Sequence, residues 1–278
     1  MVRIISFIVG LGFVGVLLLG LFGSANSLVT EPVPPSVTEE FHLEHKEVAF
    51  ASDGVMGKFD RAQLQRGLQV YKEVCAACHS LGQIAFRDLA KLGYSEAQVK
   101  KFAADWPLKQ QVLDPKTGDR TERANVAADK FPTVYYPGQG VPPDLSLITK
   151  ARHGGAAYIY SLLTGYADQA GYKNEKGVEL LKEFPDAKTP DGLYFNPYFA
   201  NLNIAMPAPL AEGSVTYTDG TKNSVDQMSK DVAAFLVWTA EPELEQRHST
   251  GLAVLGFLLI GTLLAYGSYR TIWRNVKH

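Results

Sequence analysis

The chain contains few residues of the kinds that bind metals or form cross-links. Among its 278 residues are two cysteines, four methionines and six histidines. A structural zinc site needs four Cys or His ligands at close spacing, and no such group surrounds the cysteines. The sequence shows no internal repeat and no low-complexity tract. A formal net charge of −2 argues against nucleic acid as a partner, because phosphate binding requires a basic surface.

The two cysteines lie three positions apart, and a histidine follows the second one. The segment Cys75-Ala76-Ala77-Cys78-His79 is the attachment sequence of a c-type haem. Two thiols can add across the vinyl groups of haem, and the adjacent imidazole then meets one face of the iron. A redox dithiol is the alternative, but such pairs belong near a βαβ pattern, and a polar helical stretch surrounds this one. We therefore predict covalent haem with His79 as the fifth ligand.

A helix is expected directly before this motif. Between residues 61 and 74, the apolar positions Leu64, Leu68 and Tyr71 follow helical spacing, and Asp60 is a candidate N-cap. This helix would deliver the cysteines and the histidine to the haem.

Two further helices are expected in the second half of the chain. One lies near residues 151–163, and the other begins after Ser224 and ends before Pro242. Residues 105–143 are rich in Pro, Gly, Asp and Lys, so we expect a long, mostly irregular insertion there. The pattern predicts a mainly α-helical domain with long loops.

The first 25 residues have the features of a secretory signal. Arg3 precedes an apolar run from Ile4 to Phe22, and small residues follow up to Ala25. A basic start, an apolar centre and a small-residue end predict cleavage after Ala25. An uncleaved membrane anchor is the alternative, since the run is long enough to span. Either alternative places the following domain outside the cytoplasm.

A second apolar run, from Thr250 to Tyr269, contains no charged residue. At about 1.5 Å per residue, such a helix covers the roughly 30 Å hydrocarbon layer. Arg270, Arg274 and Lys277 follow it and place the C-terminus in the cytoplasm by the positive-inside rule. The predicted organisation is a signal peptide (1–25), a periplasmic cytochrome c domain (26–249), a transmembrane anchor (250–270) and a cytoplasmic tail (271–278).

The segment between the two apolar runs is acidic. Four of the 27 basic residues flank these runs, which leaves 23 against 29 acidic residues. An acidic electron-transfer domain suits a basic soluble partner, because complementary fields speed encounter. The alternative is that the surplus of acid only keeps the domain soluble.

Methionine is the expected sixth ligand, because Met/His ligation raises the reduction potential of a c-type haem. Met1 would leave with the signal, Met228 lies on an apolar helix stripe, and Met56 precedes the haem-bearing helix too closely for an easy reach. Met206 lies in a loop that two prolines stiffen, with packing in the core as the alternative role. Met206 is the favoured candidate, and histidines elsewhere are weaker ones.

Six sequence blocks occur in the order found in one known family. They are Arg66–Ser80, Pro142–Ser146, Ala151–Gly155, Ser161–Tyr166, Tyr194–Phe199 and Val237–Glu243. Together they resemble the cytochrome c1 family over nearly all of the mature chain. The resemblance implies a mainly α, class I-like cytochrome c fold with long loop insertions and one C-terminal transmembrane helix.

The resemblance also implies roles at the haem. It implies that Arg152 pairs with a haem propionate and that Tyr158 lies near the haem. It also implies that Pro143 belongs to a segment that packs beside the haem. The same resemblance gives His79 and Met206 as the two iron ligands and the two cysteines as the haem attachment sites.

Members of this family are subunits of the dimeric cytochrome bc1 complex, a ubiquinol:cytochrome c oxidoreductase. The resemblance therefore implies electron transfer from the Rieske iron–sulfur protein to a soluble or membrane-tethered cytochrome c, beside cytochrome b and membrane lipid. It places the chain in a bacterial inner membrane. This subunit would break no substrate bond itself. A haem subunit of another membrane oxidoreductase or terminal oxidase, and a peroxidase with an open sixth position, are the alternatives.

Overall fold

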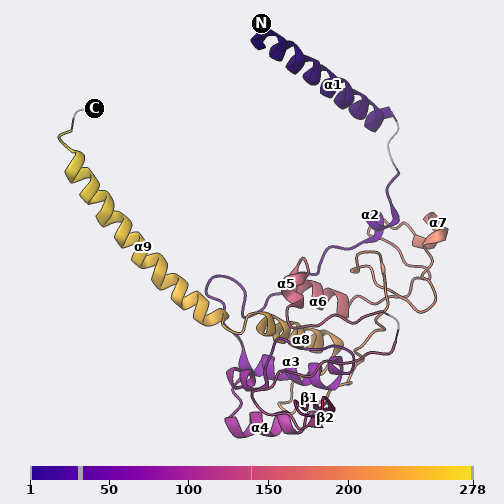
Figure 1. Cartoon of the computed structure of the whole chain (residues 1–278). Coiled ribbons are helices and arrows are strands. Elements are labelled where there is room, and N and C mark those ends of the chain that lie inside the picture. Colours follow the sequence, from indigo (N-terminus) through magenta and orange to yellow (C-terminus); the bar gives the residue numbers. More distant parts are fainter. Residues whose placement is uncertain (1, 31–33, 139, 277–278) are drawn as a thin grey trace.

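A mainly helical domain with little sheet lies between two long apolar helices (Figure 1). This computed structural model describes residues 2–30, 34–138 and 140–276, so Lys277 of the expected tail lies outside the described residues. The α-helices are α1 (Val2–Thr30), α2 (Val37–Phe41), α3 (Arg61–Glu73), α4 (Glu96–Ala104), α5 (Ile148–Ala151), α6 (Gly155–Leu163), α7 (Leu180–Glu183), α8 (Val225–Ala240) and α9 (Leu244–Trp273). The 3₁₀ helices are η1 (Cys75–Ala77), η2 (Phe86–Leu92) and η3 (Pro185–Ala187). The strands are β1 (Gln110–Leu113), β2 (Arg120–Arg123), β3 (Tyr194–Phe195) and β4 (Asn203–Ile204).

The caps of α3 and α8 agree with the sequence signals. The Asp60 carboxylate accepts a hydrogen bond from the Ala62 N–H at 2.9 Å, which satisfies one of the free donors at the start of α3. At the start of α8, the Ser224 hydroxyl accepts from the Gln227 N–H at 3.2 Å. Helix α8 ends before Pro242, as expected. Both predicted helices are confirmed.

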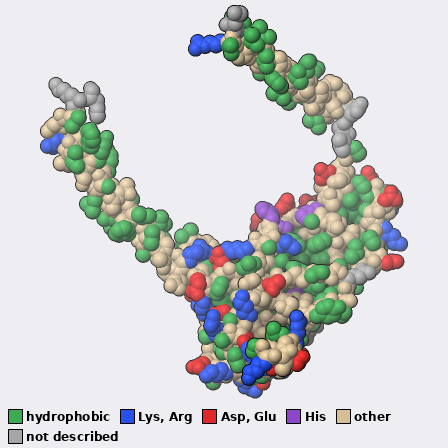
Figure 2. Space-filling view, in the orientation of Figure 1, with side chains coloured by type: hydrophobic (Ala, Val, Ile, Leu, Met, Phe, Trp, Pro, Cys, Tyr) green, Lys and Arg blue, Asp and Glu red, His purple; other side chains and the backbone are tan. Residues whose placement is uncertain are grey.

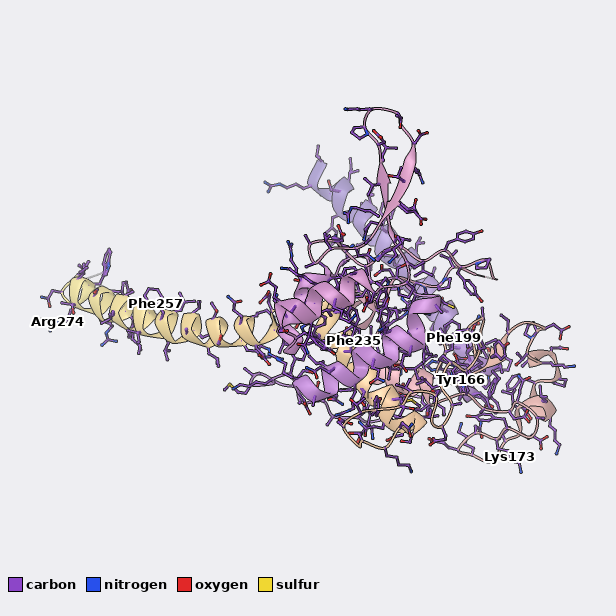
Figure 3. The ribbon with its side chains drawn as sticks, turned by 90° about the horizontal axis from the view of Figure 1, so that it is seen from below. Tyr166, Lys173, Phe199, Phe235, Phe257 and Arg274 are labelled. Atoms are coloured by element: carbon purple, nitrogen blue, oxygen red, sulfur yellow. The ribbon has the colours of Figure 1, made fainter. Side chains whose placement is uncertain are left out.

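Helices α3 and α8 cross in direct backbone contact at Gly67. A Cβ atom added at Gly67 would lie 2.1 Å from the Asp231 carbonyl oxygen and 2.6 Å from the Phe235 Cβ. Phe235, labelled in Figure 3, is fully buried, and its ring centroid lies 5.8 Å from that of Tyr71 on α3. The absence of a side chain at Gly67 therefore allows the two helices to form the centre of the core.

We expect the Gly67→Ala variant to be less stable. Alanine is favoured over glycine in a helix by about 1 kcal/mol. The added methyl group would nevertheless overlap the backbone of α8, and overpacking typically costs about 1–3 kcal/mol. Denaturant titration of the detergent-solubilised chain should show a net loss in the free energy of unfolding. Gly251→Ala is the matched control, because that helical glycine has open space around it. Equal stability of the two variants would contradict the prediction.

The helix expected near residues 151–163 is α6, which begins at Gly155, and the short helix α5 ends at Ala151 before it. Gly154 has φ +78°, in the left-handed region that ends a right-handed helix. A Cβ atom at Gly154 would lie 2.0 Å from the His45 Cδ2 atom. The break therefore depends on a glycine and on a ring that packs against it from a distant part of the chain.

The insertion at residues 105–143 contains a hairpin that the sequence did not predict. Strands β1 and β2 pair antiparallel, with Leu113 opposite Arg120. Every residue of β2 is exposed, so the strand lacks the alternation of apolar and polar residues that marks a half-buried strand. The described residues from 124 to 138 are irregular, as expected.

Both α1 and α9 are long and apolar enough to cross a membrane, by length and composition, and their most apolar windows have no buried residue. Helix α9 is the candidate C-terminal span. Helix α1 continues through Ala25 to Thr30, so the helix has no break at the expected cleavage position. Cleavage there stays a prediction.

Candidate functional site

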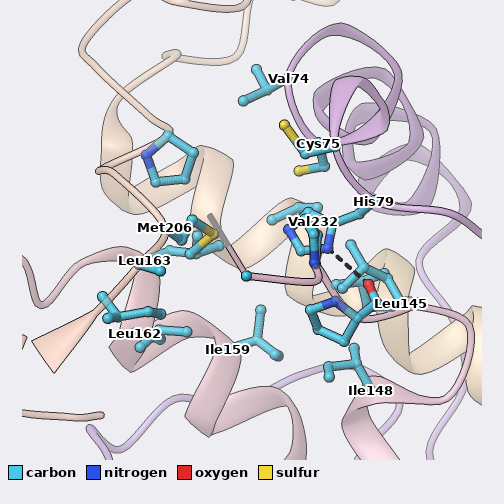
Figure 4. Close-up of a pocket in the computed structure, with 18 of the residues that line it drawn as sticks. Val74, Cys75, His79, Leu145, Ile148, Ile159, Leu162, Leu163, Met206 and Val232 are labelled. Atoms are coloured by element: carbon cyan, nitrogen blue, oxygen red, sulfur yellow. Dashed lines mark hydrogen bonds between the residues drawn. The ribbon is translucent and has the colours of Figure 1, made fainter. Parts of the chain in front are cut away.

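The site residues predicted from the sequence surround one cavity of about 370 Å³, within the size range of cofactor pockets (Figure 4). Helix α8 contributes Val232 and Leu236 to its walls, and α6 contributes Ile159 and Leu162. The seven predicted site residues that line it are Cys75, Cys78, His79, Pro143, Arg152, Tyr158 and Met206. The structure therefore brings together residues that are up to 131 positions apart in the sequence.

Both cysteines are placed by the tight turn that follows α3. The N–H groups of Cys78 and His79 donate to the Cys75 carbonyl at 3.1 and 2.9 Å. Neither cysteine forms a disulfide, and each is half-buried as a residue. Burial, with Cys78 nearby, raises the pKa of the Cys75 thiol to about 12. The two thiols thus line the cavity as neighbours one short turn apart, which suits attachment to two points on one ring system.

The His79 imidazole is held by one hydrogen bond. Its Nδ1 atom lies 2.8 Å from the Pro143 carbonyl oxygen, which can only accept, so Nδ1 carries the proton (dashed line in Figure 4). The Nε2 lone pair is then free for a metal, the usual arrangement of a ligating histidine. Burial lowers the pKa of His79, although Pro143 and Asp144 act to raise it. The neutral tautomer needed for ligation is favoured.

Met206 lies two residues beyond the β3–β4 hairpin, on a loop held at several points. The buried Asn196 side chain donates to the Leu162 carbonyl on α6 at 2.8 Å. The Asn196 N–H donates to the Leu202 carbonyl, also at 2.8 Å. Closer to the sulfur, the Tyr166 hydroxyl donates to the Met206 carbonyl at 3.0 Å. These bonds fix the loop against α6, and sequence reasoning did not identify Asn196 or Tyr166 as its supports.

The donor set fits a c-type haem. Figure 4 shows the Met206 side chain and the His79 ring entering the cavity from different sides. Met228 is fully buried in the core of α8, and Met56 is 69% exposed, and neither lines the cavity. The imidazole of His79 and the thioether of Met206 are both of the ligand types that hold a c-type haem.

Arg152 supplies a positive charge at the edge of the cavity. Its guanidinium donates to the Ala151 carbonyl at 3.2 Å and forms no ion pair within the described part of the chain. Burial raises the pKa of Tyr158, while the Arg152 guanidinium beside it acts in the opposite direction. A guanidinium without a carboxylate partner suits a haem propionate, because its planar donors match that group.

The segment before α3 secures α6 in a way that the sequence did not reveal. The backbone N–H of Lys46 donates to the Ser161 hydroxyl at 2.8 Å. The side-chain ammonium of Lys46 donates to the Thr164 carbonyl at 3.1 Å. A cation at the C-terminus of a helix also stabilises it through the helix dipole. The His45 ring packs edge-on against Tyr158, with centroids 5.4 Å apart. These contacts position the helix that carries Tyr158.

The chain is similar to known proteins over most of its length. The model of the cytochrome C1 family matches residues 50–276. Cytochrome c1 of Rhodospirillum rubrum is 44% identical over 243 residues, covering 81% of this chain and 86% of the relative. The protein named cytochrome b/c1 of Bradyrhizobium diazoefficiens is 44% identical over 80% of this chain and 34% of its own length. The mitochondrial protein named cytochrome c1 1, heme protein, of Arabidopsis thaliana is 38% identical, over 96% of this chain and 85% of the relative.

Proposed function

Because the chain belongs to the cytochrome c1 family, we propose that it is the haem c subunit of a ubiquinol:cytochrome c oxidoreductase, the cytochrome bc1 complex. The observation that carries the proposal is the convergence of Cys75, Cys78, His79 and Met206 on one apolar cavity. Each of the four supplies a different contact that a covalently bound, six-coordinate haem requires.

Haem bound in this cavity would supply a one-electron redox centre. The thiols of Cys75 and Cys78 would tether it, and His79 and Met206 would occupy both axial positions. Apolar side chains of α6 and α8 line the cavity and would pack against the haem. With His79 and Met206 both bound to the iron, no open position would be left for a substrate. This arrangement favours electron transfer over peroxidase chemistry.

The proposed electron route runs from the Rieske iron–sulfur protein through this subunit to a soluble or membrane-tethered cytochrome c. The acidic surplus between the apolar segments supports a basic acceptor. Assembly with cytochrome b is supported by the relative named cytochrome b/c1. We propose that the assembled complex is dimeric. Helix α9 would anchor the chain in a bacterial inner membrane, with the haem domain in the periplasm, the C-terminus in the cytoplasm and the signal 1–25 removed.

Purification in mild detergent, from a host able to attach haem c, tests the proposal. We expect a red protein that keeps its haem in denaturant, shows a six-coordinate low-spin spectrum, and copurifies with cytochrome b and a Rieske protein. The Cys75→Ser/Cys78→Ser variant should lose the denaturant-resistant haem, because no thioether can form. A colourless wild-type chain would overturn the haem assignment. Copurification with oxidase subunits instead would assign the chain to a different membrane complex.

A further inference from the structure

The loop at residues 51–58 is tied to the start of α9. The Gly57 carbonyl accepts from His248 Nδ1 at 3.3 Å. One turn earlier in α9, the Glu245 carboxylate accepts from the Phe59 N–H at 2.8 Å. Figure 1 shows the chain that precedes α3 looping beside the first turns of α9. The loop therefore lies where the helix leaves the domain.

The loop is closed and held at its base. The Lys58 N–H donates to the Ala51 carbonyl at 2.8 Å. A Cβ atom at Gly57 would lie 2.1 Å from the Ser52 carbonyl oxygen, so the two arms of the loop are in contact. Arg61, at the start of α3, pairs with Glu245 at 2.8 Å. These contacts make the loop a defined projection from the domain.

Two apolar side chains occupy the tip of this loop. Val55 and Met56 are each 69% exposed, and Gly54 at φ +76° forms the turn before them. Transfer of such exposed apolar side chains from water to an apolar surrounding lowers the free energy, so the tip favours an apolar environment.

The position of the loop along α9 matches the expected membrane boundary. His248 lies two residues before Thr250, where the apolar run begins. At about 1.5 Å per residue, the contact with Gly57 lies roughly 3 Å from the start of that run along the helix. Met56 and Val55, at the tip of the loop, precede Gly57 by one and two residues. The base of the loop therefore lies beside the start of the apolar run.

Basic side chains surround this region. Lys58 is exposed and forms no ion pair within the described ranges of the chain. Arg61 at the start of α3 and Arg247 in the first turn of α9 are paired with Glu245 and Glu241. Figure 2 shows Lys and Arg side chains gathered where α9 leaves the domain. An apolar tip with a cation beside it is typical of segments that enter a membrane interface.

We propose that Val55 and Met56 insert into the headgroup–acyl boundary of the membrane that α9 crosses, with Lys58 facing anionic headgroups. The proposal rests on the proposed membrane span of α9. A single helix leaves a domain free to tilt about its point of attachment. The loop gives the domain a second membrane contact and restrains that tilt.

Spin labelling of the complete complex in vesicles of phosphatidylethanolamine and phosphatidylglycerol tests this proposal. Cys75 and Cys78 are the two cysteines of the chain, and haem attachment would consume both thiols. The Met56→Cys variant would therefore supply a free thiol in this chain for the spin label. Collisions with oxygen, which concentrates in lipid, are compared with collisions with a water-soluble nickel chelate. Matched positions are Phe257→Cys within α9 (Figure 3) and Leu113→Cys on β1, both exposed.

The label at position 56 should have an oxygen-to-chelate collision ratio severalfold above the ratio at position 113. The ratio at position 56 should approach the ratio at position 257. A ratio equal to that at position 113, with position 257 in lipid, would overturn the loop contact and leave the span intact. Protection of position 56 from both reagents would mean that a protein covers it, which also overturns the proposal. A low ratio at position 257 would overturn the span itself.

Discussion

The Met206→Leu variant should have a haem midpoint potential lowered by something of the order of 0.1 V, a fraction of the roughly 0.8 V over which axial ligands set haem potentials. The thioether favours ferrous iron, and leucine offers no donor in its place. The open sixth position should also allow ferrous iron to bind carbon monoxide, which the wild-type chain should exclude. Redox titration and optical spectra with carbon monoxide measure the two effects.

Met228→Leu is the matched control for this prediction. It makes the same substitution in the same chain, at a fully buried position of α8 that does not line the cavity. A volume-conserving core substitution of this kind usually costs less than about 1.5 kcal/mol. Its potential should stay at the wild-type value. If Met206→Leu changed neither the potential nor carbon monoxide binding, Met206 could not be the sixth ligand.

The Arg66→Met variant should lose about 3–5 kcal/mol in the free energy of unfolding, because it leaves a buried carboxylate unpaired. Arg66 Nε lies 2.9 Å from Asp231 Oδ2, and Asp231 is fully buried on α8. Gln227 also donates to Asp231, at 2.8 Å, but it carries no charge. Burial acts to lower the pKa of Arg66, and hydrogen bonds with Asp231 and Asp219 outweigh it and raise that pKa. The guanidinium therefore stays charged.

A double variant separates the charge effect from the loss of packing. Arg66→Met/Asp231→Leu replaces both charges by apolar groups, and such replacements are often close to neutral in stability. We expect it to recover most of the loss of the single Arg66→Met variant in denaturant titrations of the haem-loaded chain. A single variant within about 1 kcal/mol of wild type would show that Asp231 finds water or another partner.

Several features of the chain are encoded within a few residues, so the sequence alone predicted them. The haem motif needs only the spacing of Cys75, Cys78 and His79. The caps at Asp60 and Ser224 act on N–H groups two or three residues away. The apolar runs of α1 and α9 are continuous. Short-range patterns of this kind do not depend on how the chain folds back on itself.

Other features required the tertiary structure, because they join residues far apart in the chain. Nothing in the sequence shows that Gly67 meets the α8 backbone or that Lys46 reaches the end of α6. The Pro143 carbonyl that orients His79 is a backbone atom, which every residue type possesses. Sequence composition reduced the choice of sulfur ligand to a few methionines, and the folded chain placed Met206 at the cavity with His79. Such contacts form only when distant parts of the chain fold back against each other, and no short sequence pattern predicts which parts will meet.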